Sequence, residues 1–334
     1  MDDRSAGEAA PLRFRADWGG ANLVRAAGWL AQYVWDHTDD RRRSVIHTGR
    51  GMGDNLRALA AGEVDVALAT PAAFARLARE GRGPFADEPL TNLVAIAALP
   101  HRDAMLPAAR RDLGFSNLAD MMQYDGPLRV ALEVNDRDGF MGLACDIVLD
   151  ATRVDLDQIV ARGGSVVRYE QPFDAVDDLR EGRVDVMISE AIMTPDWQRL
   201  ASEAEVTFLS LSDQQSTWIA ERWGLAVLDV PAHYFPGQDQ PVTALDYSDW
   251  IVATTTDLPE DVARLLARAF VEDTEYFARG YRHLPVEYSP LRYPIDYRLA
   301  RRTSLPLHPA VEAEYDRYDI ESRDSLVEAE KVGQ

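Results

Sequence analysis

The sequence predicts an α/β protein built from two similar lobes, and three observations lead to this prediction. The chain has 334 residues, 46% of them hydrophobic, which is enough for about two domains of roughly 150 residues each. Predicted strands alternate with predicted helices, the order that gives parallel sheets with helices on both faces. This order occurs twice along the chain, and short stretches of the two copies match each other. Two copies indicate two lobes rather than one large sheet.

The repeat is clearest where a short helix stops at a glycine and a buried strand follows. Upstream of it, residues 11–14 (PLRF) match residues 127–130 (PLRV) as the first strand of each copy, and helical stretches follow at 21–36 and 139–151. The glycine-stopped segments share seven apolar, glycine and aspartate positions. In the first copy these are Leu56, Leu59, Gly62, Val64, Asp65, Val66 and Leu68, and in the second Val176, Leu179, Gly182, Val184, Asp185, Val186 and Ile188.

Further elements follow from shorter patterns. Apolar runs predict strands at 93–99, 166–169, 206–209 and 250–254. Asp257 is the expected N-cap of an amphipathic helix that runs to Phe277, with Pro259 in its first turn. Beyond Gly280 the chain is rich in proline and tyrosine and is expected to be irregular up to a terminal helix at 310–318. The ends, 1–10 and 321–334, are expected to be flexible tails.

Composition excludes several classes of function. The net charge of −21 argues against nucleic acid and anionic membrane as partners. Cys145 is the single cysteine, which rules out an internal disulfide, and the histidines show no metal-ligand spacing, so we expect neither a metal nor a cofactor. No paired acid and base stands out, which favours a protein without catalysis. No membrane span is expected, and the acidic first ten residues do not resemble a signal peptide.

The candidate ligand site lies in the turns that follow the strands of each copy. Parallel α/β sheets bind ligands at the carboxyl ends of their strands, where helices begin with outward N–H groups. Arg50 and Arg137 would make these turns locally positive, which suits a small carboxylate, while Trp18 and Phe140 would pack on its carbon skeleton and Asn22 would cap its helix. The alternative is that the glycines only form tight turns and the arginines only form solvated ion pairs. The candidates are Trp18, Gly20, Ala21, Asn22, Arg50 and Thr70 in the first copy, and Arg137, Asp138, Gly139, Phe140, Ser189 and Glu190 in the second.

Several stretches together resemble one family of solute receptors. They are Gly19-Gly20, the DNL of 54–56 followed by AGEVD at 61–65, AIAAL at 95–99, VPAHYFPGQD at 230–239, DLPED at 257–261 and LPLHP at 305–309. In these stretches, and in their order over about 12–318, the chain resembles the TAXI family of extracytoplasmic solute receptors of TRAP transporters. The proline-, tyrosine- and glycine-containing stretch at 230–239 is the most specific of them.

The resemblance implies a type II periplasmic-binding-protein fold with a hinge crossed more than once and a ligand captured between the lobes. Lobe 1 would comprise 11–104 and 250–320, and lobe 2 would comprise 105–249. It also implies a TRAP-type membrane permease as partner, a monomeric receptor, a periplasmic or cell-envelope location, and a small organic acid or amino acid such as glutamate as ligand. Ligand contacts would come from Gly20, Ala21, Asn22, Thr70, Asp138, Gly139 and Phe140, with Tyr234 beside Gln238 and Asp239 on a nearby loop.

The sequence departs from the family at one point of the expected site. Arg137-Asp138-Gly139 stands where the family usually has Gly-Ser-Gly, so a carboxylate replaces a hydroxyl. Asp138 could repel an anion or hold the ammonium group of an amino acid. Two rivals to a receptor stay open at this point: a cytoplasmic enzyme, or a cytoplasmic ligand sensor, on the same two-lobed fold.

Overall fold

The computed structural model describes residues 10–18, 22–39, 41–291 and 295–332. The chain divides into two compact units. Unit 1 comprises Met1–His101, Asp249–Val286 and Leu291–Gln334, and unit 2 comprises Arg102–Ser248 and Glu287–Pro290. The two main boundaries lie within a few residues of the positions expected from the sequence, and the short return at Glu287–Pro290 was not expected. Within the described residues, no helix combines the length and the apolar character needed to cross a bilayer.

Unit 1 contains a five-stranded sheet in the order β2-β1-β3-β12-β4. The bounds are β1 Leu12–Ala16, β2 Ser44–Thr48, β3 Val66–Ala69, β4 Leu93–Leu99 and β12 Trp250–Thr255. Strand β1 pairs in parallel with β2 and β3, whereas β12 runs antiparallel to both β3 and β4. The sheet is therefore mixed, and the expectation of an all-parallel sheet is wrong. The exception is β12, which begins directly after the chain re-enters unit 1 at Asp249.

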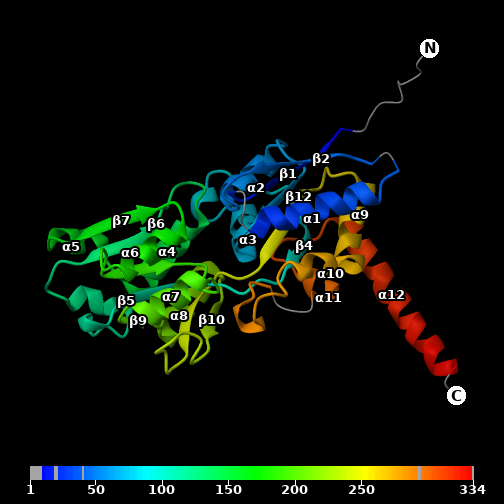
Figure 1. The fold of residues 1–334 in the computed structure, drawn as a ribbon. Helices are drawn as coiled ribbons and strands as arrows, with labels where there is room; N and C mark the ends of the chain where they lie inside the picture. The colour runs from blue at the N-terminus through cyan, green and yellow to red at the C-terminus, as the bar shows by residue number, and fades with distance from the viewer. Residues whose placement is uncertain (1–9, 19–21, 40, 292–294, 333–334) are drawn as a thin grey trace, which may run out of the picture. The chain divides into compact units, whose positions relative to one another are not determined.

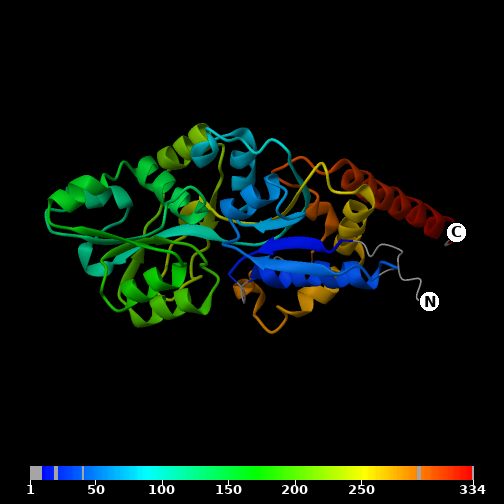
Figure 2. The ribbon, with the colours of Figure 1, turned by 90° about the horizontal axis from the view of Figure 1, so that it is seen from above.

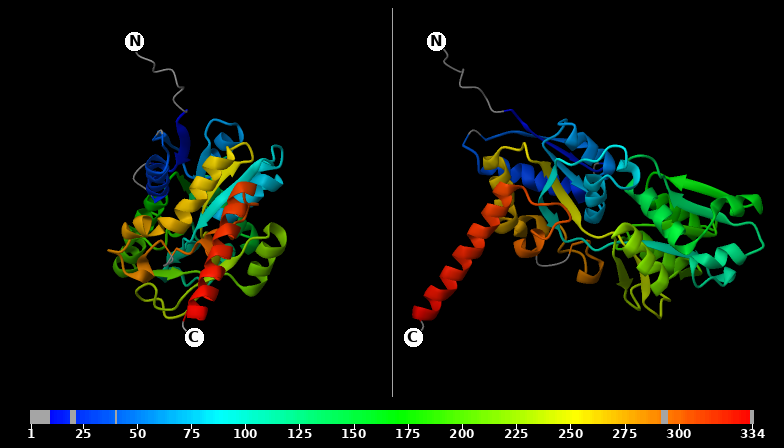
Figure 3. Two further views of the ribbon diagram at one scale, coloured as in Figure 1. Left: turned by 90° about the vertical axis from the view of Figure 1, so that its right-hand side faces the viewer. Right: turned by 180° about the vertical axis from the view of Figure 1, so that it is seen from behind.

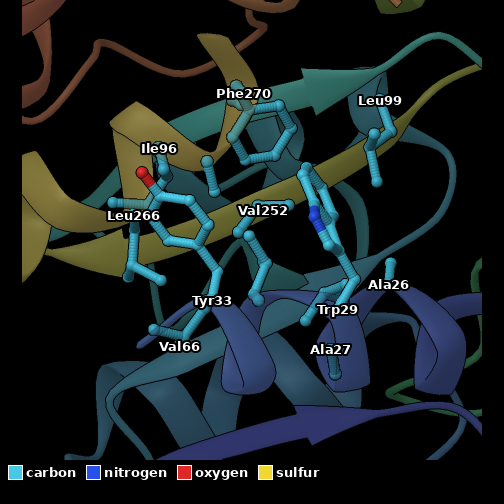
Figure 4. Close-up of a cluster of buried hydrophobic side chains, with 14 of the residues drawn as sticks. Ala26, Ala27, Trp29, Tyr33, Val66, Ile96, Leu99, Val252, Leu266 and Phe270 are labelled. Atoms are coloured by element: carbon cyan, nitrogen blue, oxygen red, sulfur yellow. The ribbon is translucent and has the colours of Figure 1, made fainter. Parts of the chain in front are cut away.

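Helices cover both faces of this sheet. On one face lie α1 Asn22–Asp36, α9 Glu260–Glu272, α10 Thr274–Arg279 and the start of α12 Pro309–Val332, and on the other lie α2 Gly53–Ala60 and α3 Ala72–Glu80. Figure 4 shows the core of the first face, where Trp29 packs edge-on against Phe270 at a ring distance of 5.0 Å. The short helix α11 Tyr297–Ala300 packs near β4.

Unit 2 repeats this arrangement. Its sheet has the order β10-β11-β5-β8-β6-β7, and β9 pairs with β5. The bounds are β5 Ala104–Arg110, β6 Arg129–Glu133, β7 Ser165–Tyr169, β8 Val186–Ser189, β9 Val206–Phe208, β10 Val227–Val230 and β11 Val242–Asp246. Strands β7, β6 and β8 are parallel, and β5 is antiparallel to β8. The strand that enters unit 2, β5, therefore takes the place that β12 takes in unit 1.

The helices of unit 2 also lie on both faces of its sheet (Figure 2). Helices α4 Phe140–Thr152 and α8 Asp213–Trp223 pack together, and α6 Pro172–Arg180 packs with α7 Pro195–Glu203 on the opposite face. The second pair covers a core that includes the fully buried Trp197. Helix α5 Leu156–Ala161 lies beside β7.

One arginine–aspartate contact occurs in the same form in both units. In unit 1, Arg13 donates from its backbone N–H and Nε to Asp65 Oδ2 (2.8 and 3.1 Å) and from Nη2 to Asp65 Oδ1 (2.7 Å). In unit 2, Arg129 makes the same three bonds to Asp185, at 2.8, 3.0 and 2.7 Å. The arginine lies at the beginning of the first strand of each copy, as the second residue of β1 and the first of β6, and the aspartate lies just before the third strand. The repeat recognised in the sequence is therefore a repeat of side-chain geometry as well.

Four further differences from expectation concern individual elements. Strands β5, β10 and β11 were not expected. The helix expected to run to Phe277 is interrupted at Asp273 and continues as α10. Asp257 does not cap it, because Pro259 occupies the N-cap position without a side-chain cap. The terminal helix α12 continues to Val332, well beyond Tyr318, and extends away from the sheet of unit 1 in Figure 3. Residues 321–332 contain neither glycine nor proline, so no strong helix-breaking residue occurs there.

Candidate ligand-binding turns

In unit 1, the turns after β1, β2 and β3 meet at one edge of the sheet. The N–H of Gly49 donates to the carbonyl of Asp17 (3.4 Å), and the N–H of Thr70 donates to the carbonyl of Gly51 (2.8 Å). These two bonds link the three turns to one another. The structure thereby brings together the candidates Trp18, Asn22, Arg50 and Thr70. The candidates Gly20 and Ala21 lie outside the described residues.

Asn55 holds this edge together from the inside. Its side chain is fully buried, and its Nδ2 donates to the carbonyls of Arg15 (3.2 Å), Ala16 (3.0 Å) and Leu68 (2.7 Å). Its Oδ1 accepts a bond from Arg15 Nε (3.1 Å). A Cβ atom on Gly49 would lie 2.2 Å from Asn55 Oδ1, so the turn after β2 leaves no room for a side chain there. Asn55 therefore fixes the ends of β1 and β3, a role that the sequence analysis missed.

The cap of α1 is Asp17, and the expectation that Asn22 caps this helix is wrong. Asp17 Oδ2 accepts the N–H of Leu23 (2.9 Å), and Asp17 Oδ1 accepts that of Val24 (3.0 Å). Burial raises the pKa of Asp17, although these two bonds favour its ionised form. Asn22 instead accepts a hydrogen bond from the hydroxyl of Tyr281 (2.8 Å).

The turn after β2 is folded around Asp54. Asp54 Oδ2 accepts the N–H of Arg50 (2.9 Å), and Asp54 Oδ1 accepts that of Met52 (3.3 Å). Arg15 Nη2 adds an ion pair at 3.3 Å. The chain's own carboxylates thus occupy several of the N–H groups that we expected to receive a ligand. A ligand's charged end must rely on other donors at this edge.

Thr70 provides such a donor. Its Oγ1 atom is buried and has no hydrogen-bond partner among the described residues. It lies at the end of β3, directly before the cis peptide bond to Pro71. Trp18, with 37% of its surface exposed, lies in the turn after β1. A buried hydroxyl and an exposed indole in turns at the same sheet edge are groups that can hold a small polar molecule with a carbon skeleton.

In unit 2, the turn after β6 packs tightly against the start of α4. A Cβ atom on Gly139 would lie 2.7 Å from the carbonyl oxygen of Val134, so only glycine fits at this candidate position. Arg137 is exposed, Asp138 is half-buried, and the N–H of Asp138 donates to Asp136 Oδ1 (2.8 Å).

Phe140 does not face the solvent at this turn. Its side chain is fully buried and forms part of the core beneath α4. The expectation that it packs on a ligand's carbon skeleton is therefore not met in this structure. The apolar character of α4, which is buried along most of its length, explains why the ring points inward.

The turn after β8 contains the candidates Ser189 and Glu190 and is held by Asp103. Asp103 Oδ2 accepts the N–H of Ala191 (3.2 Å), and Asp103 Oδ1 accepts that of Ile192 (3.1 Å). Ala191 has a φ of +66°, a conformation that non-glycine residues rarely adopt. Asp103 thus stabilises a strained turn directly beside Glu190, and the sequence analysis did not assign it a role.

Ser189 faces inward and bonds to a buried glutamate. Its Oγ donates to Glu133 Oε1 at 2.6 Å, and both side chains are fully buried. Burial raises the pKa of Glu133 to about 8, although the bond from Ser189 acts in the opposite direction. Ser189 is therefore part of the interior of unit 2 rather than an exposed contact residue. Glu133 ends β6 and was not singled out from the sequence.

Tyr234 lies in the loop after β10 and is largely buried. Burial, followed by the nearby charge of Asp103, raises the pKa of its hydroxyl. Gln238 closes the loop by donating from Nε2 to the carbonyls of Val230 (3.3 Å), Pro231 (3.1 Å) and Gln240 (2.9 Å). Because Gln238 closes the loop, this part of the most specific sequence stretch has a structural role. Asp239 beside it is exposed.

The sequence of the chain also matches the model of a known protein family. The model described as the NMT1-like family matches residues 27–316. The chain belongs to the NMT1-like family. A search of curated proteins finds no match.

Solved structures show the same fold at low sequence identity. MatC (Rpa3494) from Rhodopseudomonas palustris, solved with bound malate, is 16% identical, with a TM-score of 0.50 over 93% of this chain and 98% of that chain. XAC2383 from Xanthomonas citri, solved with a chloride ion, is 15% identical, with a TM-score of 0.52 over 92% and 99% of the two chains. The fold of this NMT1-like protein is therefore the two-unit α/β fold of periplasmic binding proteins, as predicted. The described residues contain no group of three or more His, Cys, Asp or Glu side chains placed to hold a metal ion.

Proposed function

We propose that this NMT1-like protein is a solute receptor of the TAXI type, which captures a small organic acid or amino acid and delivers it to a TRAP-type membrane permease. The receptor acts as a monomer outside the cytoplasm and carries out no catalysis. The candidate ligand contacts lie in turns at the carboxyl ends of the strands, and those of unit 1 are Trp18, Asn22, Arg50 and Thr70. Arg137, Asp138, Gly139, Glu190 and Tyr234 are the contributions of unit 2.

The observation that carries the proposal is the buried Thr70 Oγ1 without a partner among the described residues. Leaving a buried polar group unpaired costs about 1–3 kcal/mol, so such groups in native proteins need an explanation. Thr70 lies where α/β sheets bind ligands, at the end of a parallel strand and hydrogen-bonded to the turn that carries Arg50. A ligand oxygen that bonds to this hydroxyl removes the cost. Family membership and fold support a binding protein in general terms.

A thermal-shift screen of the full chain tests the proposal. The compounds are L-glutamate, other amino acids and C4–C6 dicarboxylates, with malate included because a protein of the same fold was solved with it. A ligand at a hundredfold excess over its Kd adds about 2.7 kcal/mol to the stability of the native state, which raises the midpoint visibly. No stabilisation by any member of these classes would contradict the proposed ligand class.

A second measurement separates the receptor from the enzyme alternative. The stabilising compound is incubated with the protein for hours and followed by NMR. A receptor returns the compound unchanged, whereas chemical conversion would show that the same fold serves an enzyme. Reconstitution with a TRAP-type permease in proteoliposomes then tests the partner, because uptake of the compound should require the receptor.

A further inference from the structure

Helices α1 and α10 of unit 1 pack against each other and enclose a groove that the proposed function does not use. Its volume is about 600 Å³, and small-molecule sites typically have volumes of roughly 300–1,000 Å³. Every lining residue belongs to α1, to α10 or to the two residues after α10. The lining includes Arg25, Gly28 and Trp29 of α1 and Tyr276, Phe277 and Arg279 of α10. Among the described residues, no candidate contact of the turns at the strand ends lines this groove.

The base of the groove is aromatic. Trp29 stacks on Phe277 with ring centres 5.2 Å apart, and Phe277 packs edge-on against Tyr281 at 5.4 Å. The indole N–H of Trp29 donates to Asp273 Oδ2 (3.0 Å), which fixes the orientation of this ring. These three rings are almost fully buried, whereas Tyr276 has 55% of its surface exposed. The groove therefore offers an accessible ring above a fixed aromatic base.

A glycine in the middle of α1 keeps the groove open. A Cβ atom on Gly28 would meet nothing within 4 Å, so packing within the chain does not require glycine there. Glycine weakens a helix relative to alanine. A local weakness without a packing reason is typical of functional sites. Because Gly28 lines the groove, a larger side chain at this position would extend into it.

The rim of the groove is positively charged, although the chain as a whole has a net charge of −21. The lining contains Arg25 and Arg279 and no acidic residue. The guanidinium of Arg25 lies 5.9 Å from the ring centre of Tyr281, and no carboxylate of the described residues pairs with it. Arg279 is exposed and pairs with Glu275 at 3.5 Å, but Arg282 binds the same carboxylate at 2.6 Å. One carboxylate is thus shared by two arginines, which leaves the rim suited to an anion.

We propose that this groove is an additional ligand site of unit 1, which binds an aromatic carboxylate. The ring of the ligand packs against Tyr276 above the aromatic base, and its carboxylate is bound by Arg25 and Arg279 at the rim. Arginine suits both parts of such a ligand, because its planar guanidinium donates two N–H groups to a carboxylate and also stacks on aromatic rings. A small molecule fits better than a protein partner, since stable protein interfaces involve roughly 20–30 residues on each side. The site is independent of the ligand proposed for the turns at the strand ends.

Calorimetry of the full chain with 2-naphthoate tests the binding, and 2-naphthamide, which has the same rings without the charge, tests the role of the carboxylate. We expect 2-naphthoate to bind and the amide to bind about tenfold more weakly. Arg25→Gln and Arg279→Gln should each raise the Kd for 2-naphthoate about tenfold, because each removes a charged hydrogen-bond donor. Arg199→Gln is the matched control, since Arg199 is an exposed arginine of α7 that pairs with Asp196 (3.2 Å), and this variant should bind as the original chain does. The proposal would be overturned if 2-naphthoate did not bind, if acid and amide bound equally, or if Arg25→Gln left the Kd unchanged.

Two further measurements test whether the compound lies in the groove. Gly28→Leu should abolish binding, because the leucine side chain would occupy the space above the aromatic base, and thermal denaturation checks that this variant folds. Fluorine NMR of the original chain labelled with 3-fluorotyrosine does not depend on that variant. The resonance of Tyr276, assigned as the one missing in Tyr276→Phe, should shift when 2-naphthoate is added, whereas that of Tyr124 in unit 2 should not. An unshifted Tyr276 resonance, or binding that persists in folded Gly28→Leu, would show that the compound binds elsewhere and that the proposal is wrong.

Discussion

Thr70 Oγ1 and Glu133 Oε2 are buried polar atoms without a hydrogen-bond partner among the described residues. Their surroundings suggest different explanations. Thr70 lies at the edge of the sheet in unit 1, where a ligand oxygen can complete its bonding. Glu133 is enclosed within unit 2, and protonation removes its charge instead. These two atoms lead to separate predictions, one for binding and one for stability.

Replacing Thr70 by valine should weaken ligand binding without lowering the stability of the free chain, because the variant no longer buries an unpaired hydroxyl. The hydroxyl makes no bond within the described residues, so the free chain loses none, while the ligand loses one worth about 1–3 kcal/mol, roughly 5- to 150-fold in Kd. Calorimetry with the compound found by the screen measures the affinity. Thr254→Val is the matched control, because Thr254 Oγ1 donates to the carbonyl of Asp65 (2.8 Å), so that variant should lose stability but not affinity. If Thr70→Val lowered stability but left the affinity unchanged, Thr70 would not be a ligand contact.

Glu133→Gln should flatten the pH dependence of stability. The pKa of Glu133 is about 8 in the folded chain against an ordinary value of 4.5, so the folded state holds a proton that the unfolded state releases. From this group alone, the free energy of unfolding falls by about 1.4 kcal/mol per pH unit as pH rises from 4.5 to 8. Urea denaturation of both proteins at several pH values measures the difference. If the free energies of unfolding of the two proteins changed with pH in parallel, Glu133 would be ionised in the folded chain over this range.

At the scale of elements, the start of α4 shows how a helix is fitted to the turn before it. A Cβ atom on Gly142 would lie 2.2 Å from the carbonyl oxygen of Val134 and 2.4 Å from the backbone N of Asn135. Backbone atoms at such distances cannot yield as a flexible side chain can. In α1, by contrast, a Cβ atom on Gly28 would meet nothing within 4 Å. The two helical glycines therefore differ, because only Gly142 is required to be glycine by the packing around it.

Alanine at these two positions should have opposite effects. Gly28→Ala should stabilise the protein by about 0.5–1 kcal/mol, because alanine is the better helix former and has room. Gly142→Ala should destabilise it by several times that amount, since α4 must move away from residues 134 and 135. Thermal and urea denaturation measure both. Equal effects of the two substitutions would show that the packing of α4 is not tight.

The sequence predicted those elements whose pattern is local. The run at 93–99 coincides with β4, because seven successive apolar residues between turn residues favour a buried strand. Strand β5 was missed, since Pro107 in its centre argues against a strand. Its pairing with β8 and β9 depends on segments far along the chain, which local patterns do not reveal. The break at Asp273 is likewise a tertiary effect, because Asp273 accepts a bond from the indole of Trp29.

At the scale of the whole molecule, both units repeat one arginine–aspartate contact, with one difference. Asp185 also accepts a bond from Arg110 Nη1 at 3.1 Å, and it is less exposed than Asp65. Burial acts to raise the pKa of both aspartates, but the arginines outweigh it and hold both pKa values below the ordinary 3.8. Each contact therefore stabilises its unit above that pH and loses its effect in acid, as the carboxylate takes up a proton.

Asp65→Asn and Asp185→Asn should each destabilise the protein at pH 7, by about 1–3 kcal/mol. The loss should be larger for Asp185, which has two arginine partners. Near pH 2 the differences from the original chain should shrink, because the aspartates are then protonated. Urea denaturation at pH 7 and pH 2 measures this. A loss that stays constant with pH would show that the charge of the aspartate is unimportant.

The location of the candidate turns was predictable from the sequence, whereas the hydrogen bonds within them were not. The location of the turns follows from strand order alone, and Arg50, Thr70 and Glu190 do lie at the ends of their sheets. The acceptors of the N–H groups in these turns were not predictable, because Asp17, Asp54 and Asp103 look like ordinary surface acids in the sequence. Their roles depend on burial and on contacts between distant segments, as for Asp103 and Ile192. Phe140 was misjudged for the same reason, because its burial is a property of the folded unit.

The two ends of the long segment of unit 2 are joined to each other. The N–H of Asp103 donates to Ser248 Oγ at 3.1 Å, and that hydroxyl donates back to the carbonyl of Asp103, also at 3.1 Å. A segment whose two ends lie side by side can be replaced by a related segment with little distortion of the rest of the protein. Grafting the corresponding segment of a relative between His101 and Asp249 would replace the candidate contacts of unit 2 and leave those of unit 1 unchanged. If the chain is the receptor proposed above, recombination at these two points would change its ligand preference in a single step.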